Sequence, residues 1–267
     1  MLKDITLGQY FPGDTVIHRL DPRTKIVMVG VYLVALFTAS WPISMMIVAA
    51  FLGLVILLSQ VNPRLLVRNL RPLVIILLFT GLINLFMTPG EPIVSVWIFR
   101  ITLEGLERAV TLVVRIVMMI MGTFILTYTT APMTLTDGLE SLMRPLKRIR
   151  VPVHELTLIM SMALRFIPTL IEETDKIMSA QRARGADFET GNLLKRAKAL
   201  IPILIPLFMS AFRRAEELAI AMESRCYHDS ESRTRMRQLR FERRDLLAGL
   251  VGIALLVLVF GIRGPLG

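Results

Sequence analysis

The most constraining feature of this sequence is a long stretch without charge. No Asp, Glu, Lys or Arg occurs from Ile26 to Pro63, and this stretch exceeds the ~20 apolar residues that one helix needs to cross a bilayer. The motif "SWP" offers a turn in its middle. We therefore predict two short spans, Lys25–Ala39 and Ile43–Ser59, joined by a tight hairpin with Trp41 at the membrane interface. One long, broken helix is the alternative.

Other apolar stretches predict three further spans, at about Pro72–Gly90, Leu106–Thr130 and Leu246–Ile262. The whole chain agrees, because 54% of its 267 residues are hydrophobic and its mean hydropathy is +0.62, which is too apolar for an ordinary soluble domain. Arg115 lies inside the fourth predicted span. Such an arginine either has a function or reaches the nearby surface by snorkelling.

Basic residues in the short loops predict the orientation of the chain. Arg64, Arg68 and Arg71 lie between the second and third predicted spans, whereas the first hairpin has no charge. Because Lys and Arg favour the cytoplasmic side, we expect the amino terminus in the cytoplasm and the carboxyl terminus outside. The net charge of +10 fits lipid head groups better than a nucleic acid, since Phe241 is the sole aromatic residue in the basic segment His228–Asp245.

Residues 131–244 carry helical apolar stripes without strand alternation. We predict a cytoplasmic domain here, between a four-helix membrane domain at 1–130 and a final transmembrane helix at 245–267. It begins with a short helix capped by Thr136 or Asp137. The predicted fold is thus an all-α integral membrane protein with about five transmembrane helices, two long cytoplasmic helices and one short one.

The two long helices are predicted to end alike. The first ends in Ala183, Arg184 and Gly185, and the second ends, 41 positions on (225 − 184), in Ser224, Arg225 and Cys226. An arginine in the last turn complements the helix dipole by about 0.3–1 kcal/mol, which suffices to explain either one alone. The repetition favours a partner, because a guanidinium pairs bidentately with carboxylates and small neighbours let it enter a groove. We expect a soluble protein pair with two equivalent acidic grooves.

Small residues also recur along these helices. Ala211, Ala215 and Ala219 form a stripe on the second helix, and Ser179 with Ala183 gives the first a shorter one. Small residues let two backbones approach closely, so we expect the helices to cross near these positions. The alternative is that alanine is simply a good helix former.

The motifs of common enzymes are absent from the sequence. His154 and Glu155 resemble the start of a zinc protease motif, but Leu158 stands where its second histidine would be. There is no phosphate-binding loop of the form GxxxxGK[ST] and no GxSxG nucleophile motif. The single cysteine excludes an intramolecular disulfide. We therefore expect a protein that is not an enzyme and that binds no metal or cofactor itself.

Four segments carry a resemblance to a known family. "AQRARGADF", "AMESRCY", "HRLDPRTKI" (18–26) and "ALRFIPTLIEETDKI" (163–177) are together similar to the transmembrane coupling component of energy-coupling factor (ECF) transporters, the EcfT or CbiQ-like proteins. The resemblance covers essentially the whole chain. It departs at the second helix end, where Ser224 and Cys226 replace the commoner alanine and glycine; we interpret Cys226 as a spacer rather than a reactive thiol.

This resemblance implies a multi-pass scaffold in the plasma membrane of a prokaryote, within an ABC-type importer of vitamins or metal ions. It implies that two cytosolic ATPases, which carry the ATP and Mg²⁺, bind the helix ends with Arg184 and Arg225. It also implies that a small membrane protein, the substrate-binding S component, docks on the same helices. ATP binding would draw the arginines together and change the crossing angle, so that the S component reorients.

Three other classes of function each require different residues. A self-contained permease requires polar residues facing one another within several spans, and Arg115 and Asn84 are a thin set. A membrane-bound enzyme requires clustered carboxylates or histidines. A membrane-anchored assembly protein without a transport role is left open by the residues alone.

Overall fold

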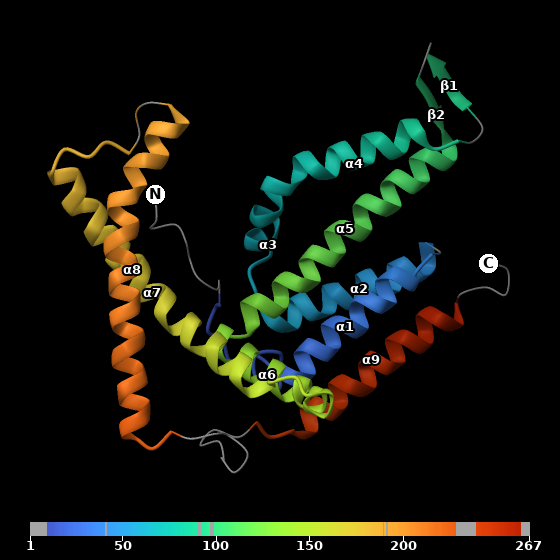
Figure 1. Ribbon diagram of the computed structural model, residues 1–267. Coiled ribbons are helices and arrows are strands. Elements are labelled where there is room, and N and C mark those ends of the chain that lie inside the picture. The colour runs from blue at the N-terminus through green and yellow to red at the C-terminus, as the bar shows by residue number, and fades with distance from the viewer. Residues whose placement is uncertain are drawn as a thin grey trace. The chain divides into compact units, whose positions relative to one another are not determined.

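The computed structural model describes residues 10–40, 42–89, 92–96, 99–188, 190, 192–227 and 239–262. These residues are almost entirely helical, as predicted (Figure 1). They group into two units. Gly8–Leu142 and Leu239–Gly267 form the first, here called the membrane unit, and Met143–Gln238 contributes the second, here called the helix-pair unit.

Seven α-helices in the described part of the chain belong wholly or mainly to the membrane unit: α1 (Pro22–Thr38), α2 (Pro42–Ser59), α3 (Pro63–Leu70), α4 (Val74–Met87), α5 (Leu103–Thr129), α6 (Pro132–Met143) and α9 (Arg243–Gly261). Proline opens four of them, because its fixed φ suits the first helical turn. Side chains satisfy the amide groups that the first turn leaves without partners. Asp21 accepts the Arg23 N–H, and Asn62 accepts the Arg64 N–H.

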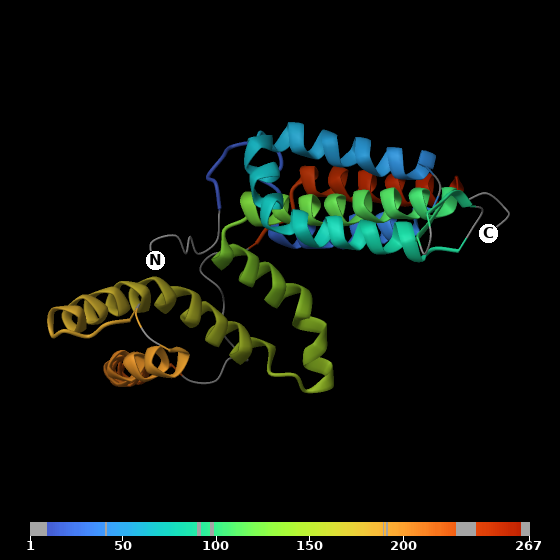
Figure 2. The ribbon, with the colours of Figure 1, turned by 90° about the horizontal axis from the view of Figure 1, so that it is seen from above.

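The core of the membrane unit lies among α1, α2, α5 and α9, which run side by side (Figures 1 and 2). Its buried members include Tyr32, Leu36, Val48, Ile125 and Val259. The Tyr32 hydroxyl has a hydrogen-bond partner inside this core, because its O–H donates to the Met118 carbonyl at 2.9 Å. Close packing of these side chains aligns the four helices.

Five described helices are long and apolar enough to cross a membrane: α2, the continuous stretch Pro63–Met87, α5, α9 and α7 (Val153–Ala183) of the helix-pair unit. The first four overlap the predicted spans two to five. The predicted first span falls on α1, which has 17 residues and is roughly 25 Å long. Trp41, expected at the interface, lies outside the described residues.

A two-stranded antiparallel ribbon joins α4 to α5, which the sequence analysis did not predict. It consists of β1 (Pro92–Val96) and β2 (Phe99–Thr102), with Val94 opposite Ile101. Residues 93, 94 and 96 are Ile, Val and Val, and β-branched residues favour strands. A local strand preference therefore operates in the connection between these two apolar helices.

The helix-pair unit consists of a 3₁₀ segment (Arg144–Ile149), α7 and α8 (Leu193–Ser224). Both long helices end where predicted, at Ala183 and Ser224. The expected start of the short helix was wrong. This helix, α6, begins at Pro132, so Thr136 and Asp137 lie inside it and do not cap it. Most of α6 groups with the membrane unit, and the predicted domain limits 1–130, 131–244 and 245–267 stay predictions.

Candidate functional site

The carboxyl end of α7 is shaped by a tight C-cap. Arg184 is the C-cap residue, and Gly185 follows with φ 88°. The Gly185 N–H donates to the Arg182 carbonyl at 2.9 Å, and the Ala186 N–H donates to the Gln181 carbonyl at 3.0 Å. These two bonds define a Schellman motif, which satisfies terminal carbonyl groups of a helix.

The carboxyl end of α8 repeats this geometry. Arg225 is the C-cap residue, and Cys226 follows with φ 53°. The Cys226 N–H donates to the Glu223 carbonyl at 2.9 Å, and the Tyr227 N–H donates to the Met222 carbonyl at 3.0 Å. The predicted likeness of the two ends therefore extends from sequence to backbone conformation. Cys226 adopts a left-handed conformation that is easier for glycine.

All six residues of the two ends are exposed: Ala183, Arg184, Gly185, Ser224, Arg225 and Cys226. Neither guanidinium makes an ion pair or hydrogen bond with another residue that the structure describes. The backbone groups of each helix end are thus hydrogen-bonded within the chain, while the exposed guanidinium of each arginine is available to a partner.

The two arginines lie at opposite ends of the helix pair. A connection of nine residues, 184–192, returns the chain from α7 to α8, and His154 Nε2 at the start of α7 lies 3.4 Å from the Tyr227 hydroxyl beyond the end of α8. The pair is therefore antiparallel.

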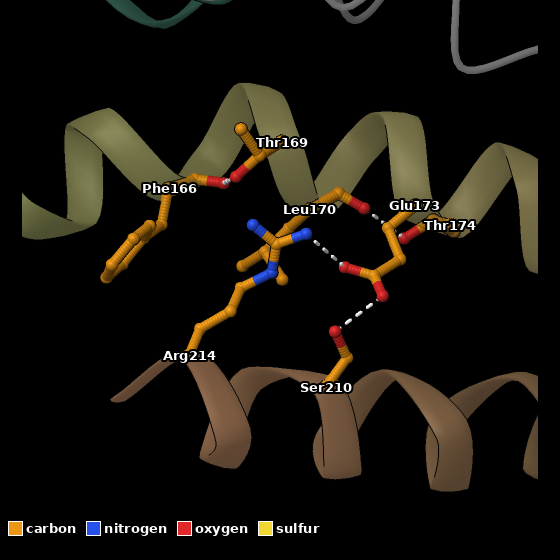
Figure 3. Close-up of polar contacts among 7 residues, drawn as sticks. All are labelled: Phe166, Thr169, Leu170, Glu173, Thr174, Ser210 and Arg214. Atoms are coloured by element: carbon orange, nitrogen blue, oxygen red, sulfur yellow. Dashed lines mark hydrogen bonds and ion pairs between the residues drawn. The ribbon is translucent and has the colours of Figure 1, made fainter. Parts of the chain in front are cut away.

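An ion pair and a hydrogen bond join the two helices where they cross (Figure 3). Glu173 of α7 accepts from Arg214 Nη2 at 3.0 Å through one carboxylate oxygen, and from the Ser210 hydroxyl at 2.5 Å through the other. The Glu173 side chain is 24% exposed and that of Arg214 38%. Two charge-assisted bonds on one half-buried carboxylate fix which turns of the helices meet.

This crossing lies at equal distance from the two helix ends. Glu173 precedes Arg184 by 11 residues (184 − 173), and Arg214 precedes Arg225 by 11 residues (225 − 214). Eleven residues of α-helix extend about 16 Å. The charge partners at the crossing are thus placed symmetrically with respect to the arginine ends. Sequence reasoning missed this contact, although Glu173 and Arg214 share the 41-residue spacing of the two motifs.

The predicted stripe of small residues lies beside the crossing contact. Ala211, next to Ser210, is half-buried, whereas Ala215, Ala219 and Ser179 are exposed. The Ser179 hydroxyl donates to the Asp175 carbonyl of its own helix at 2.7 Å. Close approach of the helices at these four positions stays a prediction.

A metal-binding group is not found in the described part of the chain, where no three His, Cys, Asp or Glu side chains are placed to hold an ion. The distinctive groups of the helix-pair unit are instead two exposed guanidiniums and an apolar surface. Phe208, Met209 and Phe212 of α8 are 61%, 61% and 68% exposed. Exposed apolar surface of this kind marks an interaction site.

These features define the class of the protein: a helical integral membrane protein that also has two long helices with exposed, cationic ends. Comparison with known proteins agrees. The family model for CbiQ, described as a cobalt transport protein, matches residues 13–236. The chain belongs to this family.

Curated relatives match nearly the entire chain, and those compared here are named "Energy-coupling factor transporter transmembrane protein EcfT". The protein of Acidaminococcus fermentans is 52% identical over 263 residues, which are 98% of this chain and 98% of the relative. That of Thermosediminibacter oceani is 53% identical over 247 residues, 92% of this chain and 93% of the relative. That of Lactococcus lactis subsp. cremoris is 45% identical, with the same two shares.

Proposed function

We propose that this chain is the coupling subunit of an ECF-type importer, in which two cytosolic ATPases grip the ends of α7 and α8. The observation that carries the proposal is the repeated C-cap with its exposed arginine at Arg184 and Arg225. Because the two helices are antiparallel, one such end lies on each side of their crossing. Two ATPases, each with an acidic groove, would hold one arginine apiece.

The crossing serves as the pivot in this proposal. Because Glu173 and Arg214 stand at equal distances from the two ends, a displacement of either arginine acts on the crossing through an arm of about 16 Å. The hydroxyl of Ser210 and the guanidinium of Arg214 lower the pKa of the Glu173 carboxyl. Its charge is thus kept at neutral pH, and the ion pair weakens only as the pH falls through that lowered pKa.

An S component is the proposed partner for the apolar face of α8. This face continues from Phe208 and Phe212 to Ile201 and Ile205, which are 50% and 60% exposed. The spacing of these four residues places them along one side of the helix. A hydrophobic partner would cover surface that neither α7 nor the rest of the described chain buries.

The location and chemistry of the complex follow from the same proposal. The chain would lie in the plasma membrane of a prokaryote, with its amino terminus and the helix-pair unit in the cytoplasm. We propose the cytoplasmic location for α7 as well, although this helix is long and apolar enough to cross a membrane. The subunit would be non-catalytic, since ATP and Mg²⁺ belong to the ATPases. The cargo would be a vitamin or a metal ion bound by the S component.

Charge reversal at the helix ends tests the proposal. In Arg184→Glu or Arg225→Glu, the complex should retain at most one ATPase per chain, because loss of a charge-assisted contact at an interface typically costs about 2–5 kcal/mol. The double variant should retain none and should lose uptake while still inserting in the membrane. Subunit stoichiometry by mass measurement on the purified complex reads this out.

Arg213→Glu is the matched control, because Arg213 is exposed on α8 away from its end. It should keep both ATPases. Recovery of both ATPases and full uptake from the double variant would refute the proposed contacts. Loss of the ATPases without any effect on uptake would favour an assembly protein instead.

A further inference from the structure

A cavity of about 320 Å³ lies within the membrane unit, between α1, α2, α5 and α9. This volume is within the range of small-molecule sites, roughly 300–1,000 Å³. Its walls are almost entirely apolar. Nothing in the proposed coupling role uses it.

Each of the four helices contributes a short stretch to the wall: 25–32 of α1, 51–58 of α2, 122–129 of α5 and 244–251 of α9. Each stretch extends about 10 Å along its helix. The amino ends of α1 and α9 and the carboxyl ends of α2 and α5 lie at the same end of the cavity. That end is cytoplasmic in the predicted orientation, so the cavity opens at the level of the inner leaflet.

The cations of the wall gather at this end. They are Lys25 and Arg244, and no Asp or Glu among the described residues contributes to the wall. The Lys25 ammonium already donates to two carbonyls and the Thr130 hydroxyl, so it contributes charge rather than a free donor. Arg244 is 45% exposed, and its Nε lies 3.9 Å from Oε2 of the more exposed Glu242, which is beyond hydrogen-bond distance. Arg244 is therefore the available anion ligand.

The cavity is open through an apolar rim. Leu54, Leu58, Leu247 and Val251, all of which line it, are 51%, 48%, 60% and 48% exposed. A water-soluble ligand would find few hydrogen-bond partners along such walls. A flexible hydrocarbon chain fits them, and an anionic group at its head would meet Arg244.

We propose that this cavity is a binding site for an anionic phospholipid of the inner leaflet, with one acyl chain between the four helices and the phosphate at Arg244. Basic pockets between transmembrane helices on the cytoplasmic side suit anionic head groups. The site depends on the membrane location of these helices and is independent of the ATPase contacts. Its test can therefore fail or succeed separately from that of the coupling role.

Lipid retention by the full-length chain, purified with its accompanying partners, tests the head-group contact. The protein is placed in nanodiscs of equal phosphatidylglycerol and phosphatidylcholine, and the retained lipids are identified by native mass spectrometry. Wild-type protein should prefer phosphatidylglycerol by about fivefold, the contribution expected of one basic residue near the membrane surface. Arg244→Gln should abolish this preference. Arg243→Gln, a neighbouring exposed arginine outside the cavity wall, should keep it.

Filling the cavity tests the acyl-chain contact. Ala248→Phe places a ring in the wall and should prevent retention of either lipid, whereas Gly249→Ala, where an added Cβ meets no atom within 4 Å, should retain it. A photoreactive residue at Leu58 should cross-link to lipid. Equal preference in the two arginine variants, unchanged retention in Ala248→Phe, or cross-linking of Leu58 to a protein would each overturn the proposal.

Discussion

The membrane unit and the helix-pair unit differ in how many of their apolar side chains are buried. In the membrane unit, Tyr32, Leu36 and Val48 belong to a continuous apolar core, and buried Lys25 and Asp245 have hydrogen-bond partners. In α8 of the helix-pair unit, Ile203 is the one buried hydrophobic residue among those described. The first unit has its own apolar core, whereas the second leaves most of the apolar side chains of α8 exposed.

This contrast explains where each unit is rigid. The membrane unit holds its helices through side chains that reach across several elements, so that its parts unfold together. The helix pair is held by a crossing with one half-buried carboxylate and few core contacts. Such a crossing can change its angle without disrupting a core, which coupling requires. Four sets of substitutions test the contrast.

The largest effect is expected from Lys25→Met in the membrane unit. Lys25 is 6% exposed and donates to the Thr129 carbonyl at 2.8 Å. Its removal leaves buried acceptors without a donor and the nearby Asp21 and Asp245 without their countercharge, at a cost of about 3 kcal/mol. The melting temperature in detergent should fall sharply. Lys198→Met, on exposed α8, is the control and should melt like the wild type.

Arg115→Met should have the next largest effect. The guanidinium donates to the Ala39 carbonyl at 2.6 Å, so it caps the carboxyl end of α1 instead of snorkelling. Ala39 is fully buried, and an unsatisfied carbonyl there costs about 1–3 kcal/mol. Thermal unfolding of this variant and of Arg108→Met, whose arginine is exposed on α5, provides the comparison. Equal stability of the two would contradict the capping role.

The crossing of the helix pair should respond to charge in a reversible way. Glu173→Arg and Arg214→Glu each place like charges together and should destabilise the crossing by roughly 1 kcal/mol, a small value because both side chains are partly exposed. The double variant restores opposite charges and should recover most of the loss. The measured quantity is substrate uptake per ATP hydrolysed. Single variants that keep normal coupling would exclude this contact as the pivot.

The smallest effect is expected at the two C-caps. Cys226→Gly relieves the left-handed strain of about 1 kcal/mol but gives the unfolded chain more freedom, so a net stabilisation of roughly 0.5 kcal/mol remains. Gly185→Ala should destabilise α7, although an added Cβ meets no atom within 4 Å. Thermal unfolding distinguishes the signs. Undiminished ATPase binding by Cys226→Gly would support the spacer interpretation, and its loss would contradict it.

Much of the architecture could be predicted from local pattern. Uncharged stretches located the spans, since a bilayer requires about 20 apolar residues whatever they pack against. The positions of Arg184 and Gly185 predicted a helix end, because the C-cap uses residues adjacent in the chain. The bounds of α7 and α8 agree with these predictions. The β-ribbon was missed because its strands are short and adjoin two apolar helices.

The sequence by itself determined the helices, the apolar spans and the two arginine ends, since each depends on residues near one another in the chain. Only the tertiary structure decided that Arg115 meets Ala39, that Glu173 meets Arg214, and that four helices enclose a cavity with Arg244 at one end. These contacts join residues far apart in sequence. Their partners are selected by packing and by the cost of leaving a buried polar group unsatisfied.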